Sequence, residues 1–200
     1  EVIQKADCWY LSVSFEYDRI ERTRGIQAKG LDWGVEHYLT TVDHTGTIEQ
    51  IETPRFLRQS RGRLTALQRD LALCKKGTRR WRELEHQIRT LHQKVARQRK
   101  DFTHQITSRL VADCALIATE KLTPKNMTRS ANGTKEKPGK NVKKKAGLNR
   151  EILNTAPGMT YEFLRYKAAE ADSEFVEVPT KQVKPSQTCP DCGLQRQKTL

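Results

Sequence analysis

Short runs of alternating apolar and polar residues open the chain and predict β-strands. The period is two over residues 7–17, and three further strand-like runs follow at 26–32, 36–42 and 47–52. The last two runs are joined by DHTG (residues 43–46), which is typical of a hairpin turn because Gly accepts backbone angles that other residues avoid. We therefore expect a three-stranded antiparallel meander after a separate first strand.

A helical period replaces the strand period in the middle of the chain. Apolar residues recur at steps of three and four over 64–74 and again over 81–102, which keeps them on one face of a helix. The two stretches are separated by KKGT. We predict an antiparallel helical hairpin at about residues 56–112 that turns at Gly77.

The second half of the chain alternates between strand and helix patterns. Residues 114–120 predict a buried strand, 158–171 a helix and 174–179 a last strand. Residues 124–150 are rich in Lys, Gly and Asn, and they have too few large apolar side chains to offset the cost of ordering, so we expect this segment to be mobile. This order of elements indicates an α/β fold with a mixed sheet and helices on its faces.

Positive charge is concentrated on the predicted hairpin. The chain has 37 Lys and Arg against 24 Asp and Glu, a net charge of +13. Residues 55–100 contain 15 basic and three acidic residues, so almost all of the net charge lies there. A purely structural coiled coil would mix the two signs. We therefore expect a polyanionic partner, with nucleic acid as the first choice and an anionic membrane surface as the second.

Two acidic residues interrupt apolar strand patterns. Asp32 lies between Leu31 and Trp33, and Glu120 ends the run LIATE. Burying a carboxylate is unfavourable unless it is paired or binds a cation. If the two strands are neighbours, both carboxylates converge at one edge of the sheet, where Mg²⁺ can hold them together. The alternatives are that Asp32 caps a turn, that Glu120 is an exposed acid beside Lys121, and that GLDWG belongs to an actin-like phosphotransferase.

The cysteines and the hydropathy pattern indicate the cellular compartment and a candidate zinc site. Five cysteines are an odd number, and two of them form CPDCG with Cys189 and Cys192, which favours a reducing compartment and a structural zinc site over disulfides. A redox CxxC is the alternative. No apolar run approaches the ~18 residues of a spanning helix, and no signal peptide is evident, so we expect a cytoplasmic protein without a membrane partner.

Five features in a fixed order carry a family resemblance. GLDWG comes first, then the basic hairpin, LIATEKLTPKNM, EFLRYKAAEADSEFVEVP and PSQTCPDCG. Together they resemble the TnpB (OrfB) proteins of insertion sequences, relatives of the type V CRISPR effector nucleases. Lys121, where the family has Asp, and Trp33, where an aliphatic residue is usual, depart from the pattern.

The resemblance implies a fold and a domain organisation. It implies a ribonuclease-H-like (RuvC) mixed sheet with an inserted basic antiparallel helical hairpin and the first half of a zinc ribbon. Residues 1–24 would end a wedge-like β domain and its linker, 25–185 would form the nuclease domain, and 186–200 would form the partial zinc ribbon. We expect truncation at both ends, because the chain opens inside a strand pattern without Met and stops eight residues after Cys192.

The resemblance also implies an activity. Asp32 and Glu120 correspond to the first two catalytic carboxylates of a two-metal Mg²⁺ site, and Cys189 and Cys192 to half of a structural Zn²⁺ site; the family's third Asp would follow a second cysteine pair. The intact protein would be an RNA-guided DNA endonuclease, located at the nucleoid when it acts on DNA, without a small-molecule substrate. We expect this chain alone to bind nucleic acid without cutting it.

Alternatively, the protein is a non-catalytic, inactivated or truncated nucleic-acid-binding relative. Residues 124–150 would be either a lid over the site or an unstructured insertion. The residues expected to contact nucleic acid are Arg58, Arg61, Arg63, Arg69, Lys75, Lys76, Arg79, Arg80, Arg82, Arg97, Arg99 and Lys100.

Overall fold

The computed structural model describes residues 1–4, 8–16, 25–134, 136–179, 188, 192, 194 and 195. It divides into two compact units. One contains Glu1–Glu21 and Pro54–Gln105, and the other contains Arg22–Thr53 and Ile106–Leu200. No helix in the described part of the chain combines the length and the apolar character needed to span a membrane.

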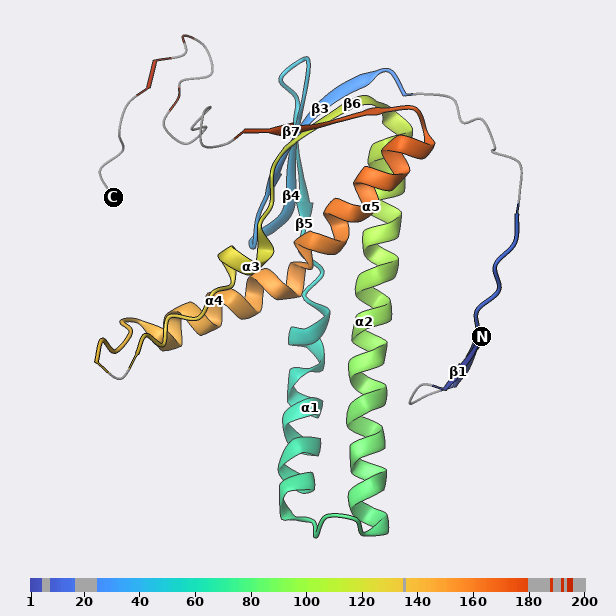
Figure 1. The fold of residues 1–200 in the computed structure, drawn as a ribbon, viewed down its shortest axis with the longest axis vertical. Helices are drawn as coiled ribbons and strands as arrows, with labels where there is room; N and C mark the ends of the chain where they lie inside the picture. The colour runs from blue at the N-terminus through green and yellow to red at the C-terminus, as the bar shows by residue number, and fades with distance from the viewer. Residues whose placement is uncertain are drawn as a thin grey trace. The chain divides into compact units, whose positions relative to one another are not determined.

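The second unit contains a five-stranded mixed sheet (Figure 1). Its strands are β3 (Gln27–Trp33), β4 (His37–Asp43), β5 (Ile48–Glu52), β6 (Cys114–Glu120) and β7 (Glu174–Val178). The order is β5-β4-β3-β6-β7. The first three strands form the predicted antiparallel meander, while β6 and β7 run parallel to β3. The α/β class, the mixed sheet and the existence of these five strands are thus confirmed.

One face of this sheet forms the core of the second unit. Leu31 and Ile117 are buried on it, and α5 (Pro157–Glu170) contributes the fully buried Leu164. The Tyr38 hydroxyl is hydrogen-bonded to the Thr160 hydroxyl, which ties α5 to β4. Helix α5 therefore covers the face that buries the odd-numbered residues of β3 and β6.

The end of α2 (Arg79–Asp113) also belongs to this core. Its Leu110 is 1% exposed. The buried ammonium group of Lys167 on α5 donates hydrogen bonds to the hydroxyls of Thr107 and Ser108 on α2, each at 2.8 Å. These bonds satisfy an amine that would otherwise be unfavourable to bury.

Residues 124–150 are more regular than expected. They contain α3 (Pro124–Met127) and the start of α4 (Val142–Thr155). The side chains of Lys145 and Asn149 donate hydrogen bonds to the carbonyls of Met127, at 2.7 Å, and Thr128, at 2.8 Å. The expectation that no interaction offsets the entropic cost of ordering was wrong for α4. Polar contacts and the burial of Ile152 stabilise this helix although the segment has few large apolar residues. Mobility of this segment stays a prediction.

The first unit contains two short strands and two long helices. Strands β1 (Val2–Gln4) and β2 (Trp9–Leu11) pair antiparallel. The predicted strand at 7–17 was too long, because β1 offers only three residues to pair with and the apolar side chains remain exposed, as for Phe15 at 76%. Residue 7 and residues 17–24 lie outside the described residues.

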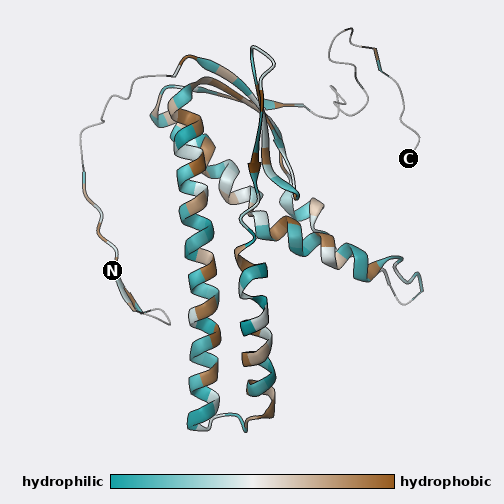
Figure 2. Cartoon of the chain, turned by 180° about the vertical axis from the view of Figure 1, so that it is seen from behind, coloured by the Kyte–Doolittle hydropathy of each residue, from teal (hydrophilic) through white to brown (hydrophobic). Residues whose placement is uncertain are grey.

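Helices α1 (Phe56–Leu73) and α2 run antiparallel and side by side (Figures 1 and 2). Hydrophobic positions recur along both helices between hydrophilic ones in Figure 2. Leu84 and Val95 are buried along this seam, and the rings of Phe56 and Phe102 meet edge to face at 6.2 Å between centroids. Helix α1 has no fully buried residue, so the seam is narrow.

Candidate metal centre and nucleic-acid surface

The pairing of β3 with β6 determines where the two strand carboxylates lie. The strands are parallel, and Leu31 is the register partner of Thr119. Asp32 and Glu120 are the next residues of their strands, so they occupy neighbouring positions on the opposite face of the sheet. The prediction that these two strands are neighbours is confirmed.

Electrostatics show that the two carboxylates interact. Asp32 is exposed and Glu120 is half-buried. Burial raises the pKa of Glu120, and the negative charge of Asp32 raises that pKa further. Two carboxylates that disfavour each other's ionisation are stabilised when a cation binds between them. The described residues contain no cluster of three or more His, Cys, Asp or Glu side chains suited to a metal, so this pair supplies two ligands.

The alternative interpretation of Glu120 was an exposed acid beside Lys121, whereas the structure shows Glu120 half-buried. The ammonium group of Lys121 lies 3.4 Å from a carboxylate oxygen of Glu177 on β7. The Tyr161 hydroxyl also donates a hydrogen bond to Glu177 and, together with Lys121, lowers the pKa of that carboxyl. Lys121 is therefore held by Glu177.

The sheet face that carries the carboxylates is more open than the face under α5. Val42 and Ile48 on this face are 43% and 65% exposed. A row of small and apolar residues crosses all five strands beside the carboxylates, in register: Ile48, Val42, Gly30, Ala118 and Val176. The carboxylate pair therefore borders an accessible surface.

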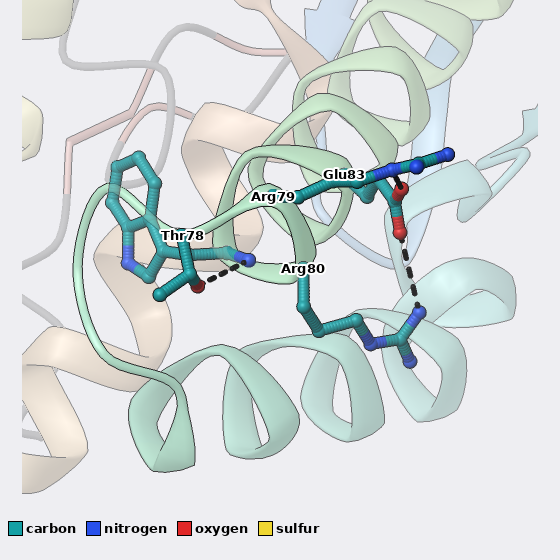
Figure 3. Close-up of polar contacts among 5 residues, drawn as sticks. Thr78, Arg79, Arg80 and Glu83 are labelled. Atoms are coloured by element: carbon teal, nitrogen blue, oxygen red, sulfur yellow. Dashed lines mark hydrogen bonds and ion pairs between the residues drawn. The ribbon is translucent and has the colours of Figure 1, made fainter.

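Part of the predicted basic surface is engaged within the hairpin itself. At the start of α2, the Thr78 hydroxyl accepts a hydrogen bond from the backbone N–H of Trp81 at 3.2 Å, as a helix N-cap does (Figure 3). Arg79 and Arg80 both contact Glu83, at 3.0 and 3.9 Å. Such exposed ion pairs are weak, so they orient these side chains more than they neutralise them.

Two further candidate arginines contact the first unit's own residues. Arg82 donates two hydrogen bonds to the carbonyl of Gly77, at 3.2 and 2.9 Å, and Arg97 donates one to the Tyr10 hydroxyl at 3.1 Å. Other candidates are exposed and have no hydrogen-bonded or ionic partner among the described side chains: Arg58, Arg61, Arg63, Arg69, Lys75, Lys76 and Lys100. These cations are the ones most available to a polyanion.

One member of the predicted zinc pair, Cys189, lies outside the described residues. The other, Cys192, is an exposed free thiol. The predicted zinc half-site therefore stays a prediction. Cys114, which the sequence placed in a strand, is buried at the start of β6, where burial raises the pKa of its thiol.

The solved structures show a likeness at the level of the fold. A Cas12f chain from a cryo-EM structure of a CRISPR-Cas12f ternary complex matches 93% of this chain with 34% of its own length. The TM-score is 0.54 and the sequence identity 17%. Similarity at this level supports a shared fold and leaves activity to other observations.

Curated relatives match nearly the whole chain. It is 32% identical over 193 residues to a putative RNA-guided DNA endonuclease, InsQ, of Escherichia coli K12, covering 96% of this chain and 46% of the relative. It is 27% identical over 194 residues to a putative RNA-guided DNA endonuclease of Streptomyces pristinaespiralis, covering 97% and 43%. The chain thus spans less than half the length of these relatives.

A family model adds a match that is independent of any single relative. The OrfB_IS605 model, described as a probable transposase, matches residues 12–131. That range is more than half of the 200 residues and contains both strand carboxylates and the whole helical hairpin. The chain therefore belongs to the IS605-type OrfB family of probable transposases.

Proposed function

We propose that this chain carries two catalytic carboxylates of an RNA-guided, metal-dependent DNA endonuclease. The observation that supports this most directly is the pairing of β3 with β6, which sets Asp32 beside Glu120. The names of the curated relatives, putative RNA-guided DNA endonucleases, point to the same activity. Because the chain spans less than half of those relatives, the rest of the catalytic site would come from a part of the protein outside these 200 residues.

The chemistry of the pair fits a divalent cation. Asp32 and Glu120 would hold Mg²⁺ through carboxylate oxygens, the ligands that this ion prefers. The bound metal would activate water and stabilise the leaving oxygen of a phosphodiester. The carboxylates themselves repel a phosphate backbone, so a bound cation would favour the approach of DNA to this edge of the sheet.

The two units would divide the work of recognition and chemistry. We assign the sheet to the ribonuclease-H-like (RuvC) type and the α1–α2 hairpin to its insertion. The hairpin's exposed Arg and Lys would contact phosphates of guide RNA and DNA without reading bases, since sequence would be read by base pairing. Such a protein would work in the cytoplasm, at the nucleoid when it acts on DNA.

A zinc ribbon would complete the architecture. Cys189 and Cys192 would supply two thiolates, and a structural zinc requires four ligands. The other two would have to come from elsewhere in the protein.

Cleavage by the full-length protein tests the proposal. With guide RNA, Mg²⁺ and guide-matched DNA, Asp32→Ala and Glu120→Ala should each lower the cleavage rate by on the order of 10³-fold or more, while the Kd for the DNA stays unchanged. Glu174→Gln is the matched control, because Glu174 lies on the same face of the sheet at the far end of β7. An Asp32→Ala protein that still cuts would overturn the assignment.

A non-catalytic nucleic-acid-binding relative is the second candidate. It is favoured by the finding that the described residues offer two carboxylates and no larger metal-binding cluster. For this candidate the full-length wild type should bind nucleic acid with a steep salt dependence, show no cleavage in Mg²⁺, and be indifferent to Asp32→Ala.

A further inference from the structure

A groove on the helical hairpin combines charged, polar and apolar side chains, and contacts to phosphates alone do not explain this combination. Its volume is about 310 Å³, and it is lined by Arg63 from α1 and by His86, Gln87, Thr90, Leu91 and Lys94 from α2. That size is at the lower end of small-ligand pockets, which begin near ~300 Å³. The groove is therefore large enough to receive one nucleotide unit.

The spacing of the groove residues on α2 places three different functional groups along one face of the helix. His86, Thr90 and Lys94 are four residues apart, so they follow one another along a single face of the helix. An aromatic ring, a hydroxyl and an ammonium group thus succeed each other at intervals of one turn. None of these three residues belongs to the candidate set predicted from the sequence, although their interval of four is visible there.

The Thr90 hydroxyl is the unusual group of the groove. Its oxygen is buried and has no hydrogen-bond partner among the described residues. Elsewhere on α2, the Thr103 hydroxyl donates to the carbonyl of Arg99, one turn earlier, at 2.9 Å. A buried polar atom without a partner is unfavourable. Thr90 lines the groove, so a rotation about its Cα–Cβ bond can present this unused hydrogen-bonding capacity to a ligand there.

The charge of the groove favours an anion. Arg63 and Lys94 are exposed and have no ionic partner among the described side chains. The nearby acid Glu85 on α2 is already paired with Arg89 at 3.2 Å. Two uncompensated cations thus flank a cavity that also contains the apolar side chain of Leu91.

Building on the proposed function, we propose that this groove binds one nucleotide of an unpaired strand. The phosphate would lie at Arg63 and Lys94, and the base would stack on the His86 ring beside Leu91. The Thr90 hydroxyl would hydrogen-bond to the nucleotide. A paired nucleotide could not enter in this way, because its base is stacked within the duplex.

Fluorescence anisotropy with the full-length protein tests this site. The probe is a labelled single-stranded oligonucleotide, and a duplex of the same length and inorganic phosphate serve as comparisons. Thr90→Val keeps the side-chain shape and removes the hydroxyl, so it should weaken single-strand binding about threefold to tenfold. It should also raise the Tm of the free protein, because it removes an unpaired buried polar atom.

The phosphate contacts have a charge-matched control. Arg63→Gln and Lys94→Gln should each weaken single-strand binding more than Arg89→Gln does, since Arg89 carries the same charge on the same hairpin but pairs with Glu85. On the duplex, all three variants should lose affinity equally through the general electrostatic attraction.

Each outcome supports or rejects a defined part of the proposal. Single-strand affinity that Thr90→Val leaves unchanged would reject the nucleotide site while leaving the proposed function intact. Full competition by inorganic phosphate at low millimolar concentration would reduce the site to one for free phosphate. A wild type that binds neither strand form would contradict the proposed function itself.

Discussion

The sheet and the helical hairpin present their charges in opposite ways. On the sheet, the positions of Asp32 and Glu120 are set by backbone pairing between β3 and β6, so little side-chain freedom remains to place them. On the hairpin, the cations are at the ends of long, exposed side chains, as for Arg61 and Lys75. Chemistry on a phosphodiester requires ligands in fixed positions, whereas attraction to a phosphate backbone tolerates movement.

The two regions also differ in how they are stabilised. The sheet and its helices fully bury Leu39, Ile117 and Leu164. Helix α1 buries no residue completely, and the hairpin seam depends on the side chains of α2. The closely packed core thus lies under the strands that carry the carboxylates. Substitutions in the two regions should therefore have different, measurable effects.

Removing a core side chain beneath the carboxylates should have the largest effect. Ile117→Ala should lower the free energy of unfolding by about 2–5 kcal/mol, because the fully buried side chain leaves a cavity in the sheet. Urea denaturation followed by circular dichroism measures the change. Ile48→Ala is the control, since Ile48 is 65% exposed and its loss should cost less than about 1 kcal/mol. Equal destabilisation in both variants would mean that the two faces of the sheet are covered alike.

Neutralising hairpin cations should weaken binding without unfolding the protein. The triple variant Arg58→Gln, Arg61→Gln, Arg69→Gln should reduce affinity for DNA about tenfold at low salt. It should also lower the slope of log K against log salt by roughly one for each phosphate that the variant no longer neutralises. Titrations at several salt concentrations measure both quantities. An unchanged slope with unchanged affinity would show that these side chains do not contact phosphates.

The start of α2 offers a change of intermediate size. Thr78→Ala removes the hydroxyl that caps the helix and should lower the free energy of unfolding by about 1 kcal/mol. Thr78→Ser is the control, because it keeps the capping oxygen. Thermal unfolding distinguishes the two, and DNA affinity should be the same in both variants. Destabilisation by Thr78→Ser equal to that by Thr78→Ala would argue against the cap.

The raised pKa of Glu120 predicts the smallest effect. The folded chain favours the protonated form, so this stabilisation is complete below the ordinary pKa of Glu and is lost as pH rises through the raised value. Glu120→Gln should therefore be more stable than the wild type above the ordinary pKa of Glu, and this gain should grow as pH rises through the raised pKa. The gain should stay below about 1 kcal/mol, because Glu120 is partly exposed.

Magnesium should reverse the shift at Glu120. Bound to the carboxylate pair, a divalent cation favours the ionised form, so the pKa measured by carboxyl NMR titration should fall when Mg²⁺ is added. The control is Asp32→Ala, in which the pKa of Glu120 should already be lower and Mg²⁺ should have less effect. A titration curve that Mg²⁺ leaves in place would argue against a shared cation.

Sequence patterns predicted which helices and strands form better than they predicted what each element packs against. The period-two and period-three-to-four patterns located the five sheet strands and the helices α1, α2 and α5, because those patterns follow directly from backbone geometry. The same alternation over 7–17 predicted a half-buried strand, yet alternation alone does not provide a neighbouring strand to pair with along its whole length. Helix α4 was missed because its Lys-rich start hides the apolar Ile152 that packs it.

At the candidate sites, local spacing could have been used further. Glu83 follows Arg79 by four residues and Arg80 by three, so their ion pairs were readable from helical geometry. The pairing of Leu31 with Thr119 was open to prediction only as a possibility, because 88 residues separate them and no local pattern sets a register at that distance. The buried hydroxyl of Thr90 depends on how two helices pack, which the sequence does not specify.

Because β3 and β6 share one register, the sheet tolerates insertions and deletions less well than the helical hairpin does. Deleting one residue within either strand would rotate every following side chain to the other face. One carboxylate would then point beneath α5 while the other stayed on the more open face. The turn at Gly77 lies at the far end of the hairpin, where whole helical turns can be added or removed together without touching that alignment. Descendants of this fold should therefore vary in hairpin length while keeping the number of residues in these two strands constant.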